Sequence, residues 1–307
     1  MMEVRITDWH QARDAARAIR TEVFIREQKV PEELEWDDDD LTAVHFIAWD
    51  KGEPAGCARL LPDGHFGRMA VRREWRRSGT GTVLLQSLIQ YAFSQAGMEI
   101  LRASAQTKAL MFYHSNGFNA DGGFYADADM PHVHIHREHR ARSLSDHLIP
   151  GKDRKTHRLE TLIAQSGWLE IVLSANPHHV TLLCGDPHHA LWSDPAVIEA
   201  FSQYARTDSS HGPRLTLLFP SEEKHWERHP LVQLQQRLSS LIELRIQPQI
   251  PKQALLLAEP WGVMQFVNDE IAMAEMNNPS RVEHLKLELR SLLEHSHRPQ
   301  NAPQSFL

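Results

Sequence analysis

The sequence predicts an α/β protein with two domains: an α+β N-terminal domain whose mixed central sheet is flanked by helices, and a second, smaller α/β domain. Both halves combine short apolar blocks, typical of strands, with apolar residues recurring every three or four positions, as in helices. The 307 residues are enough for two domains that each bury a core. We expect domains at 1–137 and 156–297, a polar linker at 138–155 and a frayed tail at 298–307.

The composition excludes several classes of protein. No apolar run approaches the length of a membrane span, and the first residues lack the apolar core of a signal peptide, so we expect a cytoplasmic protein without a membrane partner. The net charge of -7 argues against general binding of nucleic acid. Cys57 and Cys184 are the two cysteines, and their wide separation excludes a disulfide framework or a cysteine-rich zinc site.

The first elements of the N-terminal domain follow from local patterns. A short strand is expected at 4–6, and Thr7 or Asp8 can cap the helix that follows. The alternating segments 45–49 and 55–61 predict a hairpin. These elements place a helix between the first strand and an antiparallel pair.

The rest of the domain continues the alternation of strands and helices. A third strand ends at Val71, and a long helix after it is ended by Gly97. A strand at 99–105 and a helix containing Phe112 and Tyr113 come next. Two short strands, expected at 122–125 and 132–136, complete the domain.

Four consecutive carboxylates, Asp37 to Asp40, follow the first helix. A solvated acidic loop is the ordinary interpretation of such a run. The alternative is an acidic collar that attracts a cationic amine.

The stretch 67–81 joins the third strand to the long helix and carries the clearest functional signal. Arg76, Gly79 and Gly81 are spaced as R-x-x-G-x-G. Glycines allow close approach of the backbone to a ligand, and amides that open a helix attract anions. The dinucleotide-binding and Walker A patterns do not fit, because the former lacks its third glycine and the latter its Lys-Ser/Thr pair. The pattern by itself leaves two interpretations, a pyrophosphate site of another kind and a plain turn.

The R-x-x-G-x-G loop after a strand resembles that of the GCN5-related N-acetyltransferase (GNAT) superfamily. Further motifs in the same order resemble its ElaA-like branch, and together they cover residues 4–137, under half of the chain. These motifs are Glu22-Val-Phe-Ile-Arg-Glu-Gln28, Arg59-Leu-Leu61, Gly67-Arg-Met-Ala-Val71, Ala105-Gln106, Phe112-Tyr113, Gly117-Phe118 and Pro131-His132.

The resemblance implies a binding site for acetyl-CoA as co-substrate. The main chain of Met69, Ala70 and Val71 would pair with the pantetheine arm, and a backbone amide on that strand would polarise the thioester carbonyl. The side chain of Arg76 and the amides of the following loop would bind the pyrophosphate. The loop residues expected to bind the cofactor are Arg77, Ser78, Gly79, Thr80, Gly81 and Thr82.

The resemblance also implies catalytic residues. Tyr113 is the expected general acid for the departing thiolate, because a phenol remains protonated at neutral pH. The alternative for Tyr113 is a core aromatic next to Phe112. Glu27 and His132 are the two candidates for the general base. A surface ion pair for Glu27 and a structural imidazole for His132 are the alternatives.

The sequence holds 20 histidines, but their spacing predicts no metal site. His132, His134 and His136 share one face of a strand, where neighbours lie about 7 Å apart, too far for three of them to bind one ion. The pairs at 178–179 and 188–189 lack an accompanying carboxylate or thiolate pattern and are expected at the surface.

The second domain faintly resembles a single phospholipase D-like domain. The positions of that family's H-x-K-x-x-x-x-D residues would be Lys252, Ala254 and Glu259, so we expect no phosphodiesterase activity. A scaffold, a homodimer contact or a protein-partner module is the expected role. Strands are expected at 169–174, 180–184, 215–219, 242–246, 254–257 and 263–267, and helices at 195–205, 230–239 and 281–293.

The sequence thus favours an acetyl-CoA-dependent N-acetyltransferase that moves the acetyl group to a protein or small-molecule amine by direct attack on the thioester. The alternative is a non-catalytic acetyl-CoA-binding regulator that acts through the C-terminal domain. A phosphodiesterase in the C-terminal half is a third hypothesis, which the missing motif disfavours.

Overall fold

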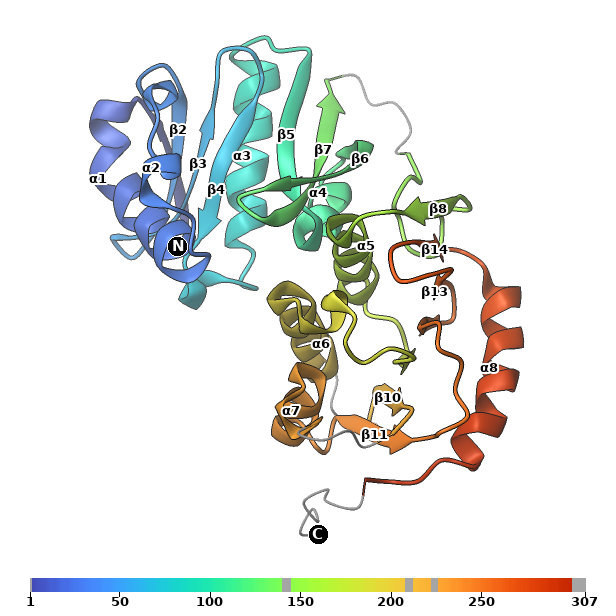
Figure 1. Ribbon diagram of the computed structural model, residues 1–307. Coiled ribbons are helices and arrows are strands. Elements are labelled where there is room, and N and C mark those ends of the chain that lie inside the picture. Colours follow the sequence, from blue (N-terminus) through green and yellow to red (C-terminus); the bar gives the residue numbers. More distant parts are fainter. Residues whose placement is uncertain (1, 140–144, 208–211, 222–225, 300–307) are drawn as a thin grey trace. The chain divides into compact units, whose positions relative to one another are not determined.

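The computed structural model describes residues 2–139, 145–207, 212–221 and 226–299 (Figure 1). The chain forms two compact units, which we call the N-terminal and C-terminal units. The N-terminal unit takes 1–105, 112–122 and 134–145, and the C-terminal unit takes 106–111, 123–133 and 146–307. Both units mix strands and helices, as predicted, but the C-terminal unit holds more of the chain and is not the smaller one.

The units interleave along the chain, because two segments within 1–137 belong to the C-terminal unit. The predicted domain boundaries therefore stay a prediction. Residues 140–144 of the expected linker, with Arg140, Arg142 and Ser143, lie outside the described residues, as do residues 300–307 of the expected tail.

The N-terminal unit is built on an antiparallel sheet in the order β1 (Glu3–Thr7), β2 (Val44–Asp50), β3 (Glu53–Leu60) and β4 (Phe66–Val71). Helix α1 (Trp9–Arg20) packs Ala16 and Ile19 against Ile47 on one face. Helix α3 (Thr80–Ser94) covers the other face, where Tyr91 meets the ring of Phe46 edge-on. The alternation of side chains along β2 thus places one helix on each face of the sheet.

The first helix begins where the sequence predicts and ends differently. The Asp8 carboxylate accepts a hydrogen bond from the Gln11 amide at 3.1 Å and caps α1. After Arg20 the chain continues as a π-helix at Thr21–Glu27 and a short helix α2 at Glu32–Glu35. A 3-10 turn follows at Asp38–Leu41.

Three further strands form a second sheet in the order β5 (Ile100–Gln106), β7 (Met130–Glu138) and β6 (Asn119–Asp127). Strands β6 and β7 are longer than expected, and the short helix α4 (Leu110–Ser115) precedes them. One isolated parallel bridge, His65 with Arg102, links β4 to β5. The predicted mixed sheet is therefore divided between two sheets that meet at this bridge.

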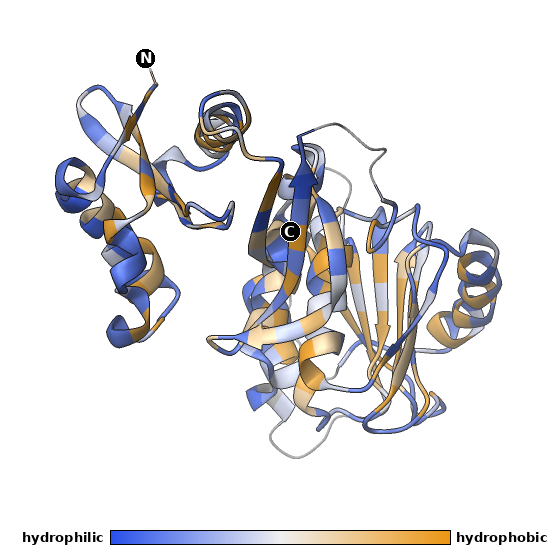
Figure 2. Cartoon of the chain, turned by 90° about the horizontal axis from the view of Figure 1, so that it is seen from above, coloured by the Kyte–Doolittle hydropathy of each residue, from blue (hydrophilic) through white to orange (hydrophobic). Residues whose placement is uncertain are grey.

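The C-terminal unit contains a mixed sheet in the order β11-β10-β9-β12-β13-β14-β8, in which β9, β10 and β11 are parallel and the other pairs are antiparallel. Helix α8 (Pro279–Glu294) packs Val282 and Leu289 on one face, and α5, α6 and α7 lie on the other (Figure 1). Apolar residues concentrate along these strands (Figure 2). The remaining bounds are β8 Thr156–Leu159, β9 His179–Leu183, β10 Leu215–Phe219, β11 Ile242–Ile246, β12 Leu255–Glu259, β13 Gly262–Phe266, β14 Ala272–Glu275, α5 Leu162–Ser174, α6 Pro195–Thr207 and α7 Pro230–Arg237.

The strand expected at 169–174 is wrong. These residues form the end of α5, which Thr161 caps by accepting a hydrogen bond from the Ala164 amide at 3.2 Å. Every residue from 165 to 173 is buried, so this part of the helix has no exposed face that would give the sequence a helical alternation of polar and apolar residues. A short apolar run cannot be distinguished from a buried helix by periodicity alone. The short strands β8 and β14 were not predicted.

No helix of the described residues has both the length and the apolar character to cross a membrane.

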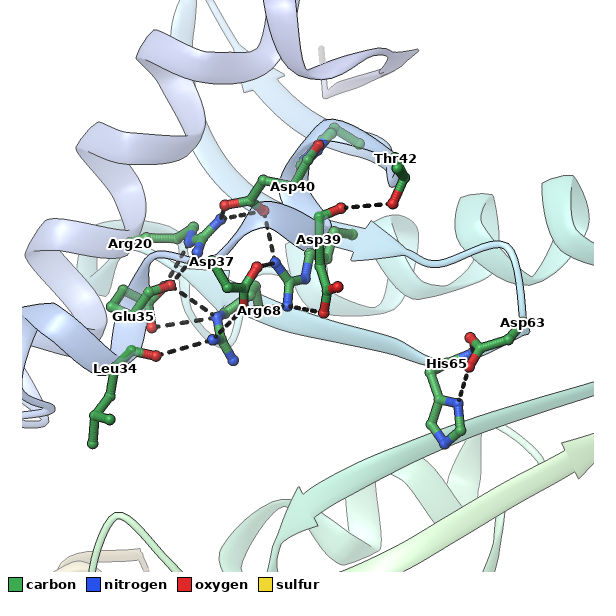
Figure 3. A network of polar contacts seen from close by, with 12 residues as sticks. Arg20, Leu34, Glu35, Asp37, Asp39, Asp40, Thr42, Asp63, His65 and Arg68 are labelled. Carbon is green, nitrogen blue, oxygen red and sulfur yellow. Dashed lines mark hydrogen bonds and ion pairs between the residues drawn. The ribbon is translucent and has the colours of Figure 1, made fainter.

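Buried ion pairs connect α1, the segment 32–41 and β3 (Figure 3). Arg20, 1% exposed, donates from Nε to Glu35 at 2.5 Å and from Nη1 to both oxygens of Asp40 at 2.8 Å. Arg59, 6% exposed, donates to Asp40 at 2.9 Å and to Asp37 at 2.8 Å. We call these five residues, with Arg68, which also pairs with Asp37, the arginine network.

The arginine network changes part of each interpretation of the acidic run. Asp40 is buried, whereas residues 37–39 are exposed, and Asp37 and Asp39 both pair with Arg59. The run is therefore solvated at 37–39, as the ordinary interpretation expects, while Asp40 belongs to the core. Arginines of the same unit offset part of the negative charge, which weakens the interpretation as a collar for an amine.

Substitution of Arg20 by leucine should destabilise the protein by about 3 kcal/mol or more, since it removes the buried cation that Glu35 and Asp40 share and leaves Asp40 with Arg59 alone. Urea unfolding of the Arg20→Leu variant measures this. The control Arg5→Gln, which breaks an exposed pair with Glu3, should cost about 1 kcal/mol or less. An equal loss of unfolding free energy in the two variants would show that the arginine network stabilises the protein no more than an exposed ion pair does.

Candidate active site

Among the described residues, no strand pairs with β4 along one of its edges. Its other edge pairs with β3, and beyond the bridge at His65 no described strand continues the sheet. Between the pairs Cys57 with Ala70 and Arg59 with Gly67 the register shifts, so that two residues of β4 lie opposite one of β3. This is a β-bulge at Arg68 and Met69. Part of the backbone at Met69 to Val71 thus lies at this open edge, where the Val71 carbonyl accepts a hydrogen bond from the side chain of Arg76.

The bulge is held by Arg68. Its backbone has a φ of 47°, in the left-handed region, and its guanidinium donates to the Leu34 carbonyl at 3.1 Å and to Asp37 at 3.0 Å. The strained residue is therefore fixed to the segment before the acidic run by the arginine network.

The loop from β4 to α3 contains the predicted pyrophosphate residues. Gly79 is the N-cap of α3 and has a φ of 88°, a conformation that suits glycine, and Arg77 has a φ of 60°. The Ser78 hydroxyl donates to the Trp75 carbonyl at 2.6 Å and lies 3.0 Å from the Thr80 hydroxyl. The first amides of α3, including those of Gly81 and Thr82, have no acceptor inside the helix. The predicted loop residues thus open a helix whose positive dipole end faces outward.

Arg76 and Glu27 form an ion pair with each other. Both terminal nitrogens of Arg76 donate to the Glu27 carboxylate, at 2.7 and 2.6 Å, and Nε donates to the Val71 carbonyl at 2.9 Å. The pairing with Glu27 raises the pKa of Arg76. This is the surface ion pair named as the alternative for Glu27, and the expected roles of Arg76 as a pyrophosphate ligand and of Glu27 as a base stay predictions. The ion pair ties the loop to the π-helix.

Tyr113 lies on α4 and points to the bulge of β4. Its hydroxyl donates to the sulfur of Met69 at 3.8 Å, and its ring packs among Phe66, Phe112 and Phe118. Burial raises the pKa of Tyr113 to about 12. The structure therefore brings the expected acid next to the expected pantetheine strand, with the hydroxyl in its protonated form.

His132 lies on β7, in a segment that belongs to the C-terminal unit. It is 6% exposed, and its Nδ1 is 2.9 Å from the Met130 carbonyl oxygen, which identifies Nδ1 as the protonated nitrogen. Burial lowers the pKa of His132, so its ring is neutral at neutral pH. His134 on the same face of the strand is exposed.

The sequence did not reveal the arginine network, although a signal was present. Arg20 stands four residues after Ala16 on the apolar stripe of α1, and Arg59 stands inside the apolar strand β3. A charged residue at a core position is buried only with a partner. The acidic run nearby was the available partner.

A strand edge open to an extended ligand, a glycine loop opening a helix and a protonated tyrosine are the features of an acyltransferase site. Residues 11–138 match the family described as acetyltransferase (GNAT) domain. The uncharacterized N-acetyltransferase YjcF of Bacillus subtilis (strain 168) is 30% identical over 124 residues, which are 39% of this chain and 88% of that protein. The uncharacterized protein YyaT of the same organism is 27% identical over 140 residues, 44% of this chain and 93% of that protein.

The chain belongs to the GNAT acetyltransferase family through its N-terminal part, as the motifs indicate. Solved structures that it resembles include an acyl-CoA N-acyltransferase from Pseudomonas aeruginosa, 28% identical with a TM-score of 0.41, covering 45% of this chain and 99% of that one. Escherichia coli ElaA is 27% identical with a TM-score of 0.42, covering 45% and 100%.

Residues 163–302 match a domain of unknown function, DUF7931. The likeness to phospholipase D stays a hypothesis. The C-terminal unit has a pocket of about 350 Å³ beside α8, where charges of both signs balance and indicate no single class of ligand. The charged lining residues are Arg245, Lys286, Arg290, Glu243, Glu259 and Glu294.

Two alanine substitutions in the loop should change stability in opposite directions. Gly79→Ala should destabilise by about 1–2 kcal/mol, because its φ of 88° is left-handed. Gly81→Ala should be neutral or stabilise by up to about 1 kcal/mol, since its Cβ would meet Phe112 at an ordinary 3.7 Å inside a helix. Thermal unfolding of both variants measures this. A Gly79→Ala protein as stable as the wild type would contradict the loop conformation.

Proposed function

We propose that the N-terminal unit transfers an acetyl group from acetyl-CoA to an amine by direct attack of the amine on the thioester. The observation that carries this proposal is the unpaired edge of β4, which leads into the glycine loop that opens α3. An extended arm on the strand and a pyrophosphate at the helix start are the two parts of one coenzyme A molecule.

The pantetheine arm would add to β4 as a further strand. The main chain of Met69, Ala70 and Val71 would pair with its two amide groups, and the side chain of Arg76 would first have to release the Val71 carbonyl. A backbone amide at the bulge would donate to the thioester oxygen and stabilise the negative charge that develops there. The arginine network would hold that amide in place, through Arg68, before the substrate arrives.

The pyrophosphate would bind to the amides of residues 77–82. Gly79 allows the turn that directs these amides to one point, and the helix dipole adds a favourable field. Arg77 is exposed and can supply a cation. Arg76 would act indirectly by holding the loop to Glu27.

Tyr113 would protonate the thiolate as it leaves. Attack of the amine nitrogen forms the bond to the carbonyl carbon, and collapse of the tetrahedral intermediate breaks the carbon–sulfur bond. The hydroxyl proton of Tyr113 then passes to sulfur, next to the Met69 position where the arm would lie. A buried phenol with a pKa of about 12 carries this proton at any neutral pH.

His132 is the proposed base for the proton of the attacking amine. Its lowered pKa supplies a neutral imidazole, and Nε2 is the nitrogen not directed at Met130. Glu27 would serve only after release from Arg76. A non-catalytic acetyl-CoA-binding regulator stays the alternative, and a turnover assay separates the two.

The acceptor is a protein or small-molecule amine. The acidic run is weak support for a cationic acceptor, because arginines offset part of its charge. Three further statements stay predictions. The C-terminal unit would select the acceptor, form a homodimer contact or bind a protein. The protein would be cytoplasmic, and it would have no nucleic-acid or membrane partner.

Acetyl-CoA should bind the full chain, and Gly79→Glu should weaken binding at least about 100-fold, because a carboxylate would oppose the pyrophosphate on a strained backbone. Calorimetric titration with acetyl-CoA and with CoA measures this. Gly97→Glu is the matched control, since Gly97 also has positive φ, has nothing within 4 Å of its Cβ, and follows the far end of α3. Absence of binding by the wild type would overturn the proposal.

Tyr113→Phe should lower kcat about 100-fold or more with little change in acetyl-CoA affinity, because it removes the proton donor and keeps the ring. Thiol release with a panel of amines and peptides measures this, beside Tyr91→Phe as control. The ratio of wild-type to variant rates should stay constant between about pH 6 and 9, since the raised pKa keeps Tyr113 protonated. A Tyr113→Phe enzyme of full activity would exclude the acid role.

A further inference from the structure

Three metal-ligating side chains meet where the chain enters the C-terminal unit. His147, Asp153 and His157 each present one ligand atom, and these atoms lie within 4.8 Å of one another. His157 Nε2 is 2.8 Å from Asp153 Oδ2, and His147 Nδ1 is 3.7 Å from the same oxygen. Two imidazoles therefore converge on one carboxylate, whereas a structural Asp-His hydrogen bond needs a single imidazole.

The central carboxylate is fixed by the backbone. Asp153 is 3% exposed, and its oxygens accept hydrogen bonds from the amides of Leu148 at 2.8 Å and Lys155 at 2.9 Å. Asp153 therefore presents its carboxylate oxygens in a defined position, as a metal ligand must.

The two histidines are held by different parts of the chain. His157 lies on β8, paired with Ala274 of β14. His147 precedes the buried residues Leu148 and Ile149, and the amide of Gly151 in the same segment donates to the Met276 carbonyl at 2.6 Å. β8, which carries His157, is paired with β14, and the segment that carries His147 is bonded to Met276, the residue after β14. The ligands are therefore held near one another before an ion binds.

The spacing suits a small tetrahedral ion. Bonds of about 2.0–2.1 Å place two ligand atoms about 3.3 Å apart, a value within reach of the distances here through small rotations of the rings. His157 would move its proton from Nε2 to Nδ1, and the ion would replace that hydrogen bond to Asp153. Two imidazoles and a carboxylate are ligands that Zn²⁺ accepts, and three protein ligands leave a fourth position for water.

We propose that His147, Asp153 and His157 bind one divalent transition-metal ion, Zn²⁺ or a close relative, which ties the segment 145–155 to β8. The site is independent of acyl transfer. The expectation of no metal rested on the histidines at 132–136, 178–179 and 188–189, and the proposal replaces it on account of the spacing H-x5-D-x3-H at 147–157.

The test is a titration of the full, untagged and metal-stripped chain with Zn²⁺ alone, in competition with a chromophoric chelator. We expect one equivalent to bind with a Kd below about 1 μM. His147→Gln and His157→Gln should each weaken this site about 100-fold or more, because each removes a ligand. His147→Gln is the gentler change, since its side chain is 24% exposed and 3.7 Å from Asp153.

His284→Gln is the matched control. His284 forms an exposed pair with Glu288 at 3.2 Å and thus offers a histidine and a carboxylate without a third ligand. This variant should keep the tight site. Cobalt in place of zinc should give the visible absorption of a four-coordinate ion in the wild type and the control, and lose it in the two ligand variants. Weak binding only, or a tight site that survives both ligand variants, would overturn the proposal.

Discussion

The ion pairs that Arg20 and Arg59 make with the buried Glu35 and Asp40 and with the partly exposed Asp37 are the constraint on which the N-terminal unit depends. Charges withdrawn from water are stable only when each is compensated, so these residues fix α1, the segment 32–41 and β3 together. Asp37 also binds the side chain of Arg68 and thereby fixes the bulge of β4. The bulge in turn positions Met69 beside the hydroxyl of Tyr113. The positions of the backbone and side chains in the candidate site therefore depend on the arginine network.

The two units share the last strands of the acetyltransferase fold. Residues 106–111 and 123–133 belong to the C-terminal unit, where Thr107 donates a hydrogen bond to the buried Glu170 of α5. Gly167 of the same helix is crowded by Phe124 and Pro131, and a Cβ there would lie 2.9 Å from the Phe124 ring. Within the C-terminal unit, α5 therefore packs on segments that fall inside the region matched to the acetyltransferase family.

Patterns of local origin were predictable from the sequence. The Asp8 cap, the β2–β3 hairpin and the glycine loop before α3 all depend on residues close in the chain. Features that depend on distant residues were not. The fully buried end of α5 has the apolar sequence of a strand. The pairing of Glu27 with Arg76 joins residues that lie 49 positions apart. The cluster at 147–157 is local in sequence, but its convergence depends on turns around Leu148 and Gly151, whose φ values are 56° and 79°.

Hydrogen–deuterium exchange of the full chain with and without acetyl-CoA tests the central claim most directly. The account predicts that the coenzyme protects amides at 69–71 and 77–82, because they pair with the pantetheine arm and the pyrophosphate. The sheet of the C-terminal unit should exchange as before. Protection that appears elsewhere in the chain and spares both of these segments would contradict the assignment of β4 and the loop as the coenzyme site.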